Sequence, residues 1–213
     1  LMDVFRARGD EVVGHGRTNA ERQGTLPEEA ERALIAEATA ALTREEGRAP
    51  AGWLGPWISQ SRTTPDLLAE AGYRYLLDWR HDDQPTWFST RGGGRILSVP
   101  YPQELNDIPS IVGRKDSGTQ FADMIVDTFE EMREAASAAP LVMGIALHPY
   151  LVGQPHRACA VDDLEDDRHV AMLAPDHLQH QQLVEVRVQQ AADDRVQAKA
   201  VVIGAFGEIH ALS

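Results

Sequence analysis

The chain is best understood from the stretch Glu11-Val-Val-Gly-His15-Gly-Arg-Thr-Asn19-Ala-Glu21-Arg22-Gln23. A short apolar run bounded by glycine is typical of a buried strand, and polar residues directly after such a strand are typical of the sites where α/β folds carry their chemistry. A histidine at this place is more often a loop residue whose ring is satisfied by backbone hydrogen bonds. The rest of the sequence is needed to decide whether His15 belongs to a functional site or only to a loop.

The length and composition indicate one globular domain. The 213 residues suffice for one sizeable core, and 43% of them are hydrophobic and 25% charged, which excludes a disordered or fibrous class. The formal net charge of -13 repels nucleic-acid phosphates and anionic membranes. Cys159 is the only cysteine, and no apolar run is long enough to span a bilayer. We therefore expect a soluble, cytoplasmic protein without nucleic-acid or membrane partners.

Strand and helix signals alternate along the first 150 residues, which is the pattern of a parallel β/α array with right-handed crossovers. Thr25, Pro27 and Glu28 are typical of a helix start, with Thr25 as its cap, and Gly47 is typical of its end. Residues 80–94 and 101–109 are interpreted as loops. Strands are predicted in residues 11–14, 51–57, 73–77, 95–100 and 141–147. Helices are predicted in residues 1–8 and 64–71 and in residues 26–46, the last with Ala30, Ala33, Leu34, Ala38, Ala41 and Leu42 on its buried side. A further helix is predicted around residues 121–132, where Phe121, Ile125, Phe129 and Met132 recur every three or four residues.

Ionisable side chains follow three of the predicted strands. His15 follows the first strand, Asp78 follows the strand at residues 73–77, and His148 follows the strand at residues 141–147. The C-terminal ends of the strands share one mouth in a β/α barrel. We therefore predict that His15, Asp78 and His148 face a single cavity, which favours the functional interpretation of His15.

Aromatic and polar residues near the same strand ends are candidates for substrate contacts. Trp53 and Trp57 either wall a pocket or belong to the core, and the sequence leaves both alternatives open. Trp79, which follows Asp78, is a further candidate wall residue. His81 and Asp83 either line the site or belong to a solvated turn, because adjacent carboxylates in a loop are common turn formers.

The residues from about 158 onward differ in character. They contain an acidic cluster at residues 162–167 and one aromatic residue, Phe206, and the β/α rhythm stops. Residues 183–188 and 201–203 are compatible with strands. His169, His177 and His180 match no strong metal-ligand spacing. We therefore treat residues 158–213 as an atypical tail of uncertain structure.

Four segments, taken in order, resemble successive motifs of the polysaccharide deacetylase family: Gly14-His-Gly-Arg-Thr-Asn19, Gly52-Trp-Leu-Gly-Pro-Trp57, Tyr75-Leu-Leu-Asp-Trp79 and Ile145-Ala-Leu-His-Pro149. The resemblance covers residues 1–157 and is closest to the intracellular branch with metal-independent, allantoinase-like hydrolases. It implies a distorted (β/α) barrel, called the NodB homology fold, and hydrolysis of a C–N bond other than a peptide bond.

The resemblance also suggests where this chain departs from the family. Deacetylases of the family use an aspartate pair on the first strand and the two histidines of a His-Xaa3-His motif. His15 matches the first histidine, but the second position is Asn19, whose neutral amide is a poor zinc ligand. We therefore expect no cofactor, with zinc as the alternative. The aspartate pair has no counterpart, so we expect the barrel to lack its first strand and the tail after Arg157 to reflect a truncated or frame-shifted gene.

The predicted reaction is hydrolysis of an amide-type bond in a small-molecule or saccharide substrate, either an N-acetylated sugar or a cyclic ureide or imide. His148 donates a proton to the leaving nitrogen, His15 with Asn19 orients water or stabilises the oxyanion, and Asp78 holds a histidine in its tautomer. The alternative is a non-catalytic pseudoenzyme domain that binds sugar or ureide. The family resemblance also suggests a homo-oligomer. Substrate contacts are assigned to Asn19, Arg22, Trp53, Trp57, Trp79, His81 and Asp83.

Overall fold

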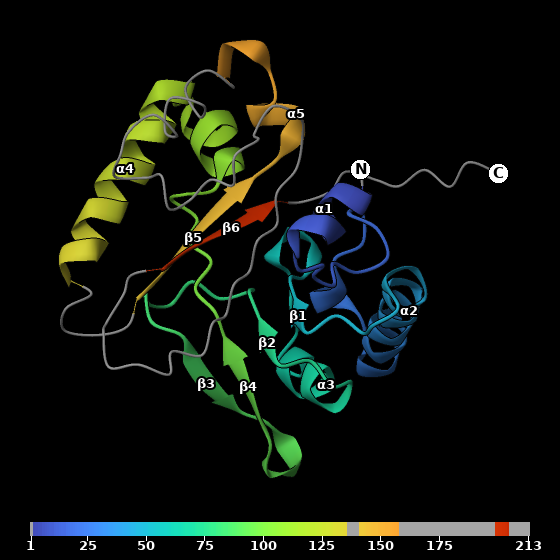
Figure 1. Cartoon of the computed structure of the whole chain (residues 1–213). Coiled ribbons are helices and arrows are strands. Elements are labelled where there is room, and N and C mark those ends of the chain that lie inside the picture. The colour runs from blue at the N-terminus through green and yellow to red at the C-terminus, as the bar shows by residue number, and fades with distance from the viewer. Residues whose placement is uncertain (1, 136–140, 158–198, 205–213) are drawn as a thin grey trace. The chain divides into compact units, whose positions relative to one another are not determined.

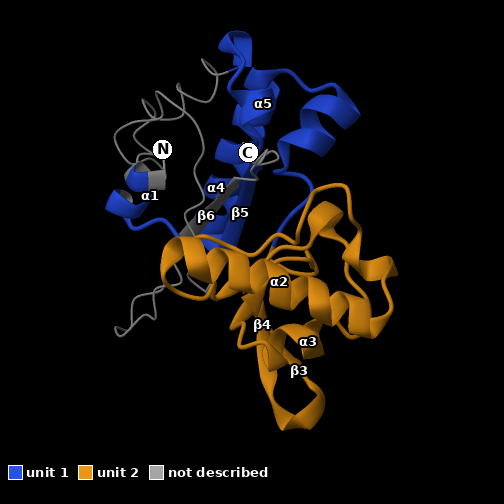
Figure 2. Cartoon of the chain, turned by 90° about the vertical axis from the view of Figure 1, so that its right-hand side faces the viewer, with its two compact units in different colours: residues 1–11, 101–206 blue, residues 12–100, 207–213 orange. Residues whose placement is uncertain are grey.

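The computed structural model describes residues 2–135, 141–157 and 199–204, and the chain divides into two compact units (Figures 1 and 2). Unit 2 contains residues 12–100, and unit 1 contains the described residues of 1–11 and 101–206. No helix in the described part of the chain is long and apolar enough to cross a membrane. Each unit has its own sheet and its own hydrophobic core.

Unit 2 is built on a four-stranded sheet. Its strands lie in the order β1 (Gly52–Trp53), β2 (Tyr75–Leu76), β4 (Arg95–Ser98) and β3 (Thr86–Ser89). The first three are mutually parallel, as the β/α pattern predicted, whereas β3 pairs antiparallel with β4. The interpretation of residues 80–94 as a loop was therefore wrong. Nearly all of β3 is exposed, so the alternation of buried and exposed residues that reveals a strand is missing there.

The first predicted strand, at residues 11–14, is reduced to a single parallel bridge. Gly14 pairs with Trp53, and its backbone exchanges hydrogen bonds with Gly52 and Leu54. This short contact is nevertheless enough to place His15 beside the end of β1. The predicted start of the following helix also needs correction, because Thr25 lies in a 3-10 turn and its hydroxyl donates to the carbonyl of Arg22.

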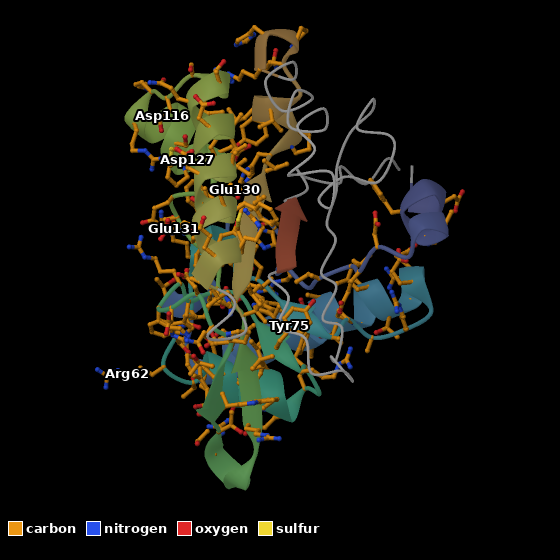
Figure 3. The ribbon with its side chains drawn as sticks, turned by 60° about the vertical axis from the view of Figure 1, so that its left-hand side comes forward. Arg62, Tyr75, Asp116, Asp127, Glu130 and Glu131 are labelled. Atoms are coloured by element: carbon orange, nitrogen blue, oxygen red, sulfur yellow. The ribbon has the colours of Figure 1, made fainter. Side chains whose placement is uncertain are left out.

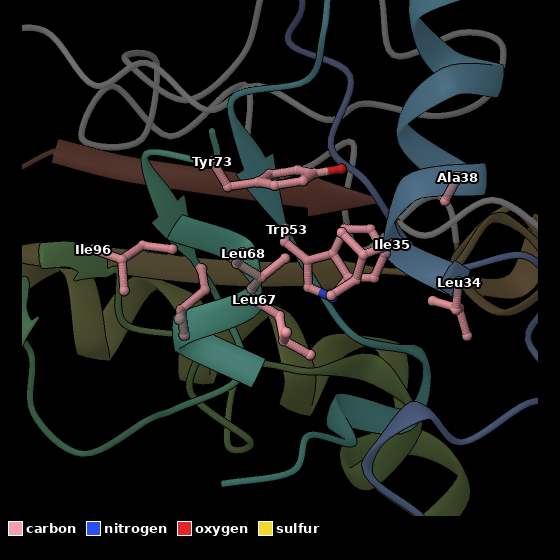
Figure 4. Packing of buried hydrophobic residues seen from close by; sticks show 9 residues of the cluster. Leu34, Ile35, Ala38, Trp53, Leu67, Leu68, Tyr73 and Ile96 are labelled. Atoms are coloured by element: carbon pink, nitrogen blue, oxygen red, sulfur yellow. The ribbon is translucent and has the colours of Figure 1, made fainter. Parts of the chain in front are cut away.

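Helices α2 (Glu28–Glu46) and α3 (Thr64–Glu70) pack with the strands in one hydrophobic core (Figure 4). The buried stripe of α2 contains Leu34, Ile35 and Ala38, which recur at the spacing of one helix face. Leu34 and Ala38 were predicted, but Ala33 is exposed and Ile35 takes its place. The helix ends at Gly47 in a left-handed conformation, as predicted. The core cluster comprises Leu34, Ile35, Ala38, Trp53, Leu67, Leu68, Tyr73, Leu76 and Ile96.

Unit 1 contains helix α4 (Gly118–Ala135) and strand β5 (Val142–Leu147), which pairs in parallel with β6 (Lys199–Gly204). The predicted strand-like run at residues 201–203 lies within β6. Figure 3 shows the carboxylates of Asp127 and Glu131 along α4, where both residues are exposed. The other face of α4 packs on β5 as its spacing predicted, in a cluster of Leu105, Ile111, Phe121, Ile125, Phe129, Met132, Met143 and Ile145.

Three further helices belong to unit 1. They are α1 (Met2–Arg8), α5 (Pro149–Val152) and the π-helix η4 (Ile108–Arg114). Helix η4 begins inside the segment that we interpreted as a loop. π-helices are rare and are frequently found at functional sites. The predictions for residues 183–188 and for His169, His177 and His180 lie outside the described residues. Closure of the strands into a barrel stays a prediction.

Candidate active site

A buried carboxylate holds His148 at two points. The residue follows β5 at the start of α5 and is 8% exposed, and its partner Asp107 has no exposed surface. One carboxylate oxygen of Asp107 accepts the backbone N–H of His148 at 2.6 Å, and the other accepts its ring Nδ1 at 2.5 Å. Because Nδ1 donates, proton transfer is left to Nε2. Such a carboxylate–histidine pair is a typical arrangement for general acid–base catalysis.

Asp107 is the residue that the sequence interpretation missed. We expected Asp78 to hold a histidine in its tautomer, but the carboxylate on His148 belongs to the segment after β4. A signal for it was present. Asp107 lies seven residues beyond the predicted strand at residues 95–100, and together with Asn106 it stands between the apolar residues Leu105 and Ile108. The segment was interpreted as a polar loop, so its carboxylate was not considered.

Asn106 fixes the backbone on which Asp107 sits. It forms a parallel bridge with Ala146 of β5, and the Ala146 N–H donates to the carbonyl of Leu105 at 2.9 Å. The side-chain oxygen of Asn106 accepts the backbone N–H of Ile108 at 3.0 Å, and its Nδ2 donates to the hydroxyl of Tyr101 at 3.3 Å. The start of the π-helix is thereby fastened to the strand that ends at His148, and the Asp107 carboxylate is left to bind the histidine.

His15 is half-buried, and its Nδ1 donates to the carbonyl oxygen of Leu54 at 2.5 Å. Asp78 is buried, and its Oδ1 accepts the backbone N–H of Gly55 at 2.6 Å. These two bonds link both side chains to the same peptide group. Burial raises the pKa of Asp78 to about 7; the bond from Gly55 opposes this rise, and the charge of Glu31 adds to it.

Three predicted substrate residues lie together in unit 2. Trp57 is 63% exposed, its Nε1 donates to the backbone carbonyl of Asn19 at 2.5 Å, and the guanidinium of Arg22 lies 5.2 Å from the ring centroid. Trp57 and Ile58 have φ angles of 61° and 54°, which cost about 1–2 kcal/mol each in residues with a Cβ atom. Strain of this kind concentrates at functional sites, so we retain the substrate-contact prediction for Asn19, Arg22 and Trp57.

Trp53 is a core residue, which is one of the two alternatives that the sequence left open. Its side chain has no exposed surface, its Nε1 donates to Oε1 of Gln23 at 3.1 Å, and its ring packs edge-on against Tyr73 at 5.4 Å. The assignment of Trp53 as a substrate contact was therefore wrong. The reason is that Trp53 packs with residues of α2 and α3 in the core of unit 2, where its indole N–H is bonded to Gln23.

Trp79, His81 and Asp83 belong to the segment between β2 and β3. The rings of Trp79 and His81 both contact Phe88 edge-on, at centroid distances of 6.0 and 5.5 Å, and both residues are exposed. Asp83 is exposed, and its backbone N–H donates to the carboxylate of Asp82 at 2.7 Å, as in a solvated turn. Their contribution to a substrate site stays a prediction.

A second buried carboxylate supports the residues around Trp53. Glu31 of α2 has no exposed surface, and its carboxylate accepts bonds from the hydroxyl groups of Ser61 (2.6 Å) and Thr64 and from Nε2 of Gln23 (3.2 Å). Gln23 in turn accepts the indole N–H of Trp53. The network joins the segment after His15, helix α2 and the segment before α3, so its role is structural.

The donors near His15 do not fit the zinc site that the family resemblance implies. Asn19 offers a neutral amide where the family resemblance implies the second histidine. Among the described residues, no three His, Cys, Asp or Glu side chains are grouped so that they could hold a metal ion. His148 lies in unit 1 and His15 and Asp78 lie in unit 2, so their convergence on one cavity stays a prediction.

The four-stranded mixed sheet with its helices defines an α/β protein similar to NodB-type deacetylases. Among solved structures, a probable polysaccharide deacetylase from Pseudomonas aeruginosa shares 30% sequence identity with a TM-score of 0.66, and PuuE allantoinase shares 26% with a TM-score of 0.68. The alignments cover 76% and 79% of this chain. A putative polysaccharide deacetylase from Mycobacterium smegmatis, at 22% identity over 84% of this chain and 70% of its own, has the same fold with a TM-score of 0.63.

The predicted resemblance to polysaccharide deacetylases is thus confirmed at the level of structure. The chain spans only 54% of the length of the Pseudomonas protein and 57% of the length of PuuE allantoinase. No protein-family model matches the sequence, and no curated protein matches it. The assignment to the intracellular, allantoinase-like branch stays a prediction.

Proposed function

We propose that the chain hydrolyses a C–N bond other than a peptide bond, and the observation that carries this proposal is the pair formed by Asp107 and His148. A carboxylate without exposed surface binds both the backbone N–H and the ring Nδ1 of one histidine. A purely structural histidine does not need two charge-assisted bonds from one buried group. The similarity to a probable polysaccharide deacetylase and to PuuE allantoinase supports the same class of reaction.

The proposed reaction begins with addition of water to the carbonyl carbon. Nε2 of neutral His148 takes up the proton that the water loses, and the adduct is a tetrahedral oxyanion. As the C–N bond breaks, the protonated His148 transfers this proton from Nε2 to the leaving nitrogen. A cyclic ureide or imide opens to a carboxylic acid that carries the nitrogen in a urea or amide group, and an N-acetylated sugar yields acetic acid and an amine. The charge on Asp107 stabilises the imidazolium before the transfer. His15, together with Asn19, orients the attacking water or stabilises the oxyanion.

The substrate class that we propose is a cyclic ureide or imide, with an N-acetylated sugar as the competing class. Both present a face that stacks on an aromatic ring, and Trp57 offers an exposed indole for this purpose. Arg22 lies over the same ring, where its N–H groups can donate to carbonyl oxygens of a planar ureide. This favours the planar class over the sugar.

The experiment compares allantoin, cyclic imides and N-acetylglucosamine oligomers as substrates, with and without a chelator. We expect His148→Ala to lower kcat by about 10²- to 10⁴-fold, because that is the usual contribution of a positioned proton donor. His156→Ala, which changes an exposed histidine of the same unit, is the matched control and should leave kcat unchanged. An unchanged rate in His148→Ala removes that residue from the mechanism.

Two other outcomes change the proposal in defined ways. Loss of activity in the chelator contradicts the metal-free reaction. Tight binding of a ureide or a sugar without any product replaces the hydrolase by the non-catalytic binding domain.

A further inference from the structure

One peptide group lies between the two predicted site residues of unit 2. The carbonyl oxygen of Leu54 accepts Nδ1–H of His15 at 2.5 Å, and the N–H of the same peptide, on Gly55, donates to Oδ1 of Asp78 at 2.6 Å. The ring, the peptide and the carboxylate form one continuous chain of hydrogen bonds. Both bonds are shorter than the usual 2.9–3.0 Å for N–H to O. For the bond to Asp78 this is expected, because a charged group takes part.

The absence of a side chain on Gly55 allows the Asp78 carboxylate to approach its backbone N–H closely. A Cβ atom on Gly55 would lie 3.3 Å from each carboxylate oxygen of Asp78 and 2.5 Å from the carbonyl oxygen of Ser59. A side chain at this position would therefore collide with the Ser59 carbonyl and crowd the Asp78 carboxylate. Asp78 is buried, and no described residue donates a hydrogen bond to its Oδ2. The bond to Gly55 is accordingly the main anchor of this carboxylate.

Hydrogen bonds that share a peptide group polarise one another. A negative carboxylate on the N–H of Gly55 draws positive charge toward that end and leaves the carbonyl oxygen of Leu54 more negative. The oxygen becomes a stronger acceptor for Nδ1–H of His15, so the tautomer that carries the proton on Nδ1 is favoured. In that tautomer, Nε2 of the neutral ring has the lone pair and can accept a proton or bind water.

We propose that Asp78 is a positioning residue which fixes the ring of His15 through the Leu54–Gly55 peptide. This differs from our prediction of a direct contact between Asp78 and a histidine. The chemical importance of Nε2 rests on the proposed function, but the coupling is a property of the folded chain and can be measured without any substrate.

The test is the tautomer ratio of His15, measured by ¹⁵N NMR of the imidazole in the full chain. The pH should be at least one unit above the pKa of about 7 of Asp78, so that the carboxylate is charged. Asp78→Asn keeps an oxygen that can accept from Gly55, removes the charge and places an NH₂ group where Oδ2 lies. We expect it to shift the ratio about threefold to tenfold toward the Nε2–H form, because charge-assisted bonds are about twice as strong as neutral ones.

Asp82→Asn is the matched control, because it removes a charge from the exposed turn that follows Asp78 and should leave the ratio unchanged. An unchanged ratio in Asp78→Asn overturns the proposal, and so does an equal shift in the control.

If Asp78→Asn does not fold, the proposal is tested by NMR scalar couplings across the two hydrogen bonds in the unmodified chain. Absence of the coupling between Gly55 N and the Asp78 carboxyl carbon, or between His15 Nδ1 and the Leu54 carbonyl carbon, overturns the proposal. Failure of the proposed hydrolysis leaves all of these readouts unaffected, so the two failures can be told apart.

Discussion

Replacement of Asp107 separates the two tasks of its carboxylate. In Asp107→Asn, the amide oxygen can still accept the backbone N–H of His148, which the native oxygen accepts at 2.6 Å. The amide NH₂ then faces ring Nδ1, where the native carboxylate accepts at 2.5 Å, so Nδ1 has to become the acceptor and the neutral ring carries its proton on Nε2. The variant keeps one anchor and loses the charge that stabilises the imidazolium.

The two substitutions at this position should therefore have different consequences. Asp107→Ala leaves two buried N–H donors of His148 without an acceptor, and at about 1–3 kcal/mol for each unsatisfied group the free energy of unfolding should fall by about 2–6 kcal/mol. Asp107→Asn should lower the free energy of unfolding by less. Its kcat should nevertheless fall by about 10²- to 10⁴-fold, because Nε2 of the neutral ring no longer has a lone pair that can take up a proton and no charge stabilises the imidazolium.

Urea denaturation measures the changes in stability. Steady-state kinetics measure kcat with whichever of allantoin, the cyclic imides and the N-acetylglucosamine oligomers proves to be hydrolysed. Asp127→Asn, an exposed carboxylate on α4, is the control for removal of one charge from unit 1. The reasoning is refuted if Asp107→Asn retains both the native kcat and the Nδ1–H tautomer of His148. It is also refuted if Asp107→Ala is as stable as the unmodified chain.

Three further predictions concern unit 2. The pKa of Asp78 is about 7 in the folded chain and 3.8 ordinarily, so unfolding between pH 3.8 and pH 7 releases a proton. The free energy of unfolding should therefore fall by up to about 4 kcal/mol as the pH rises from 3.8 to 7. Asp78→Asn should remove that fall in urea denaturation measured across the range. Trp53→Phe should lower the free energy of unfolding by about 2–4 kcal/mol, because it leaves Oε1 of Gln23 unpaired and creates a small cavity; an unchanged denaturation midpoint contradicts this. Trp57→Gly should change stability by less than about 1 kcal/mol, because glycine adopts φ of 61° without strain. In the same variant KM should rise with kcat nearly unchanged if the indole binds substrate, and an unaltered KM excludes that role.

Local rules predicted much of the fold. Glycine at residue 47 ends α2, and the three- and four-residue spacing of Phe121, Ile125 and Phe129 identified the buried face of α4. These features depend on residues close in sequence, so periodicity and capping suffice. The strand β3 was not predicted, because all of its residues except the partly buried Phe88 are exposed and no regular alternation of buried and exposed residues results.

The site was only partly predictable, because its residues are far apart in the sequence. His148 was found because it follows a long apolar strand, but its partner Asp107 is 41 residues away and its importance depends on a bridge between Asn106 and Ala146. No spacing rule connects them. For Trp53 the sequence was ambiguous, because a tryptophan near a strand end fits a pocket wall as well as a core. Only its packing with residues of α2 and α3 shows that it belongs to the core.

The bonding of Glu31 has a consequence for how unit 2 assembles. Its charge is compensated only when Gln23, Ser61 and Thr64 have all arrived from separate parts of the sequence. A partly folded state in which the Glu31 carboxylate is buried without one of these partners is destabilised by several kcal/mol, because the charge is removed from water without full compensation. We expect this penalty to make misfolded alternatives of the unit unstable, so that α2 docks last or together with both neighbouring segments.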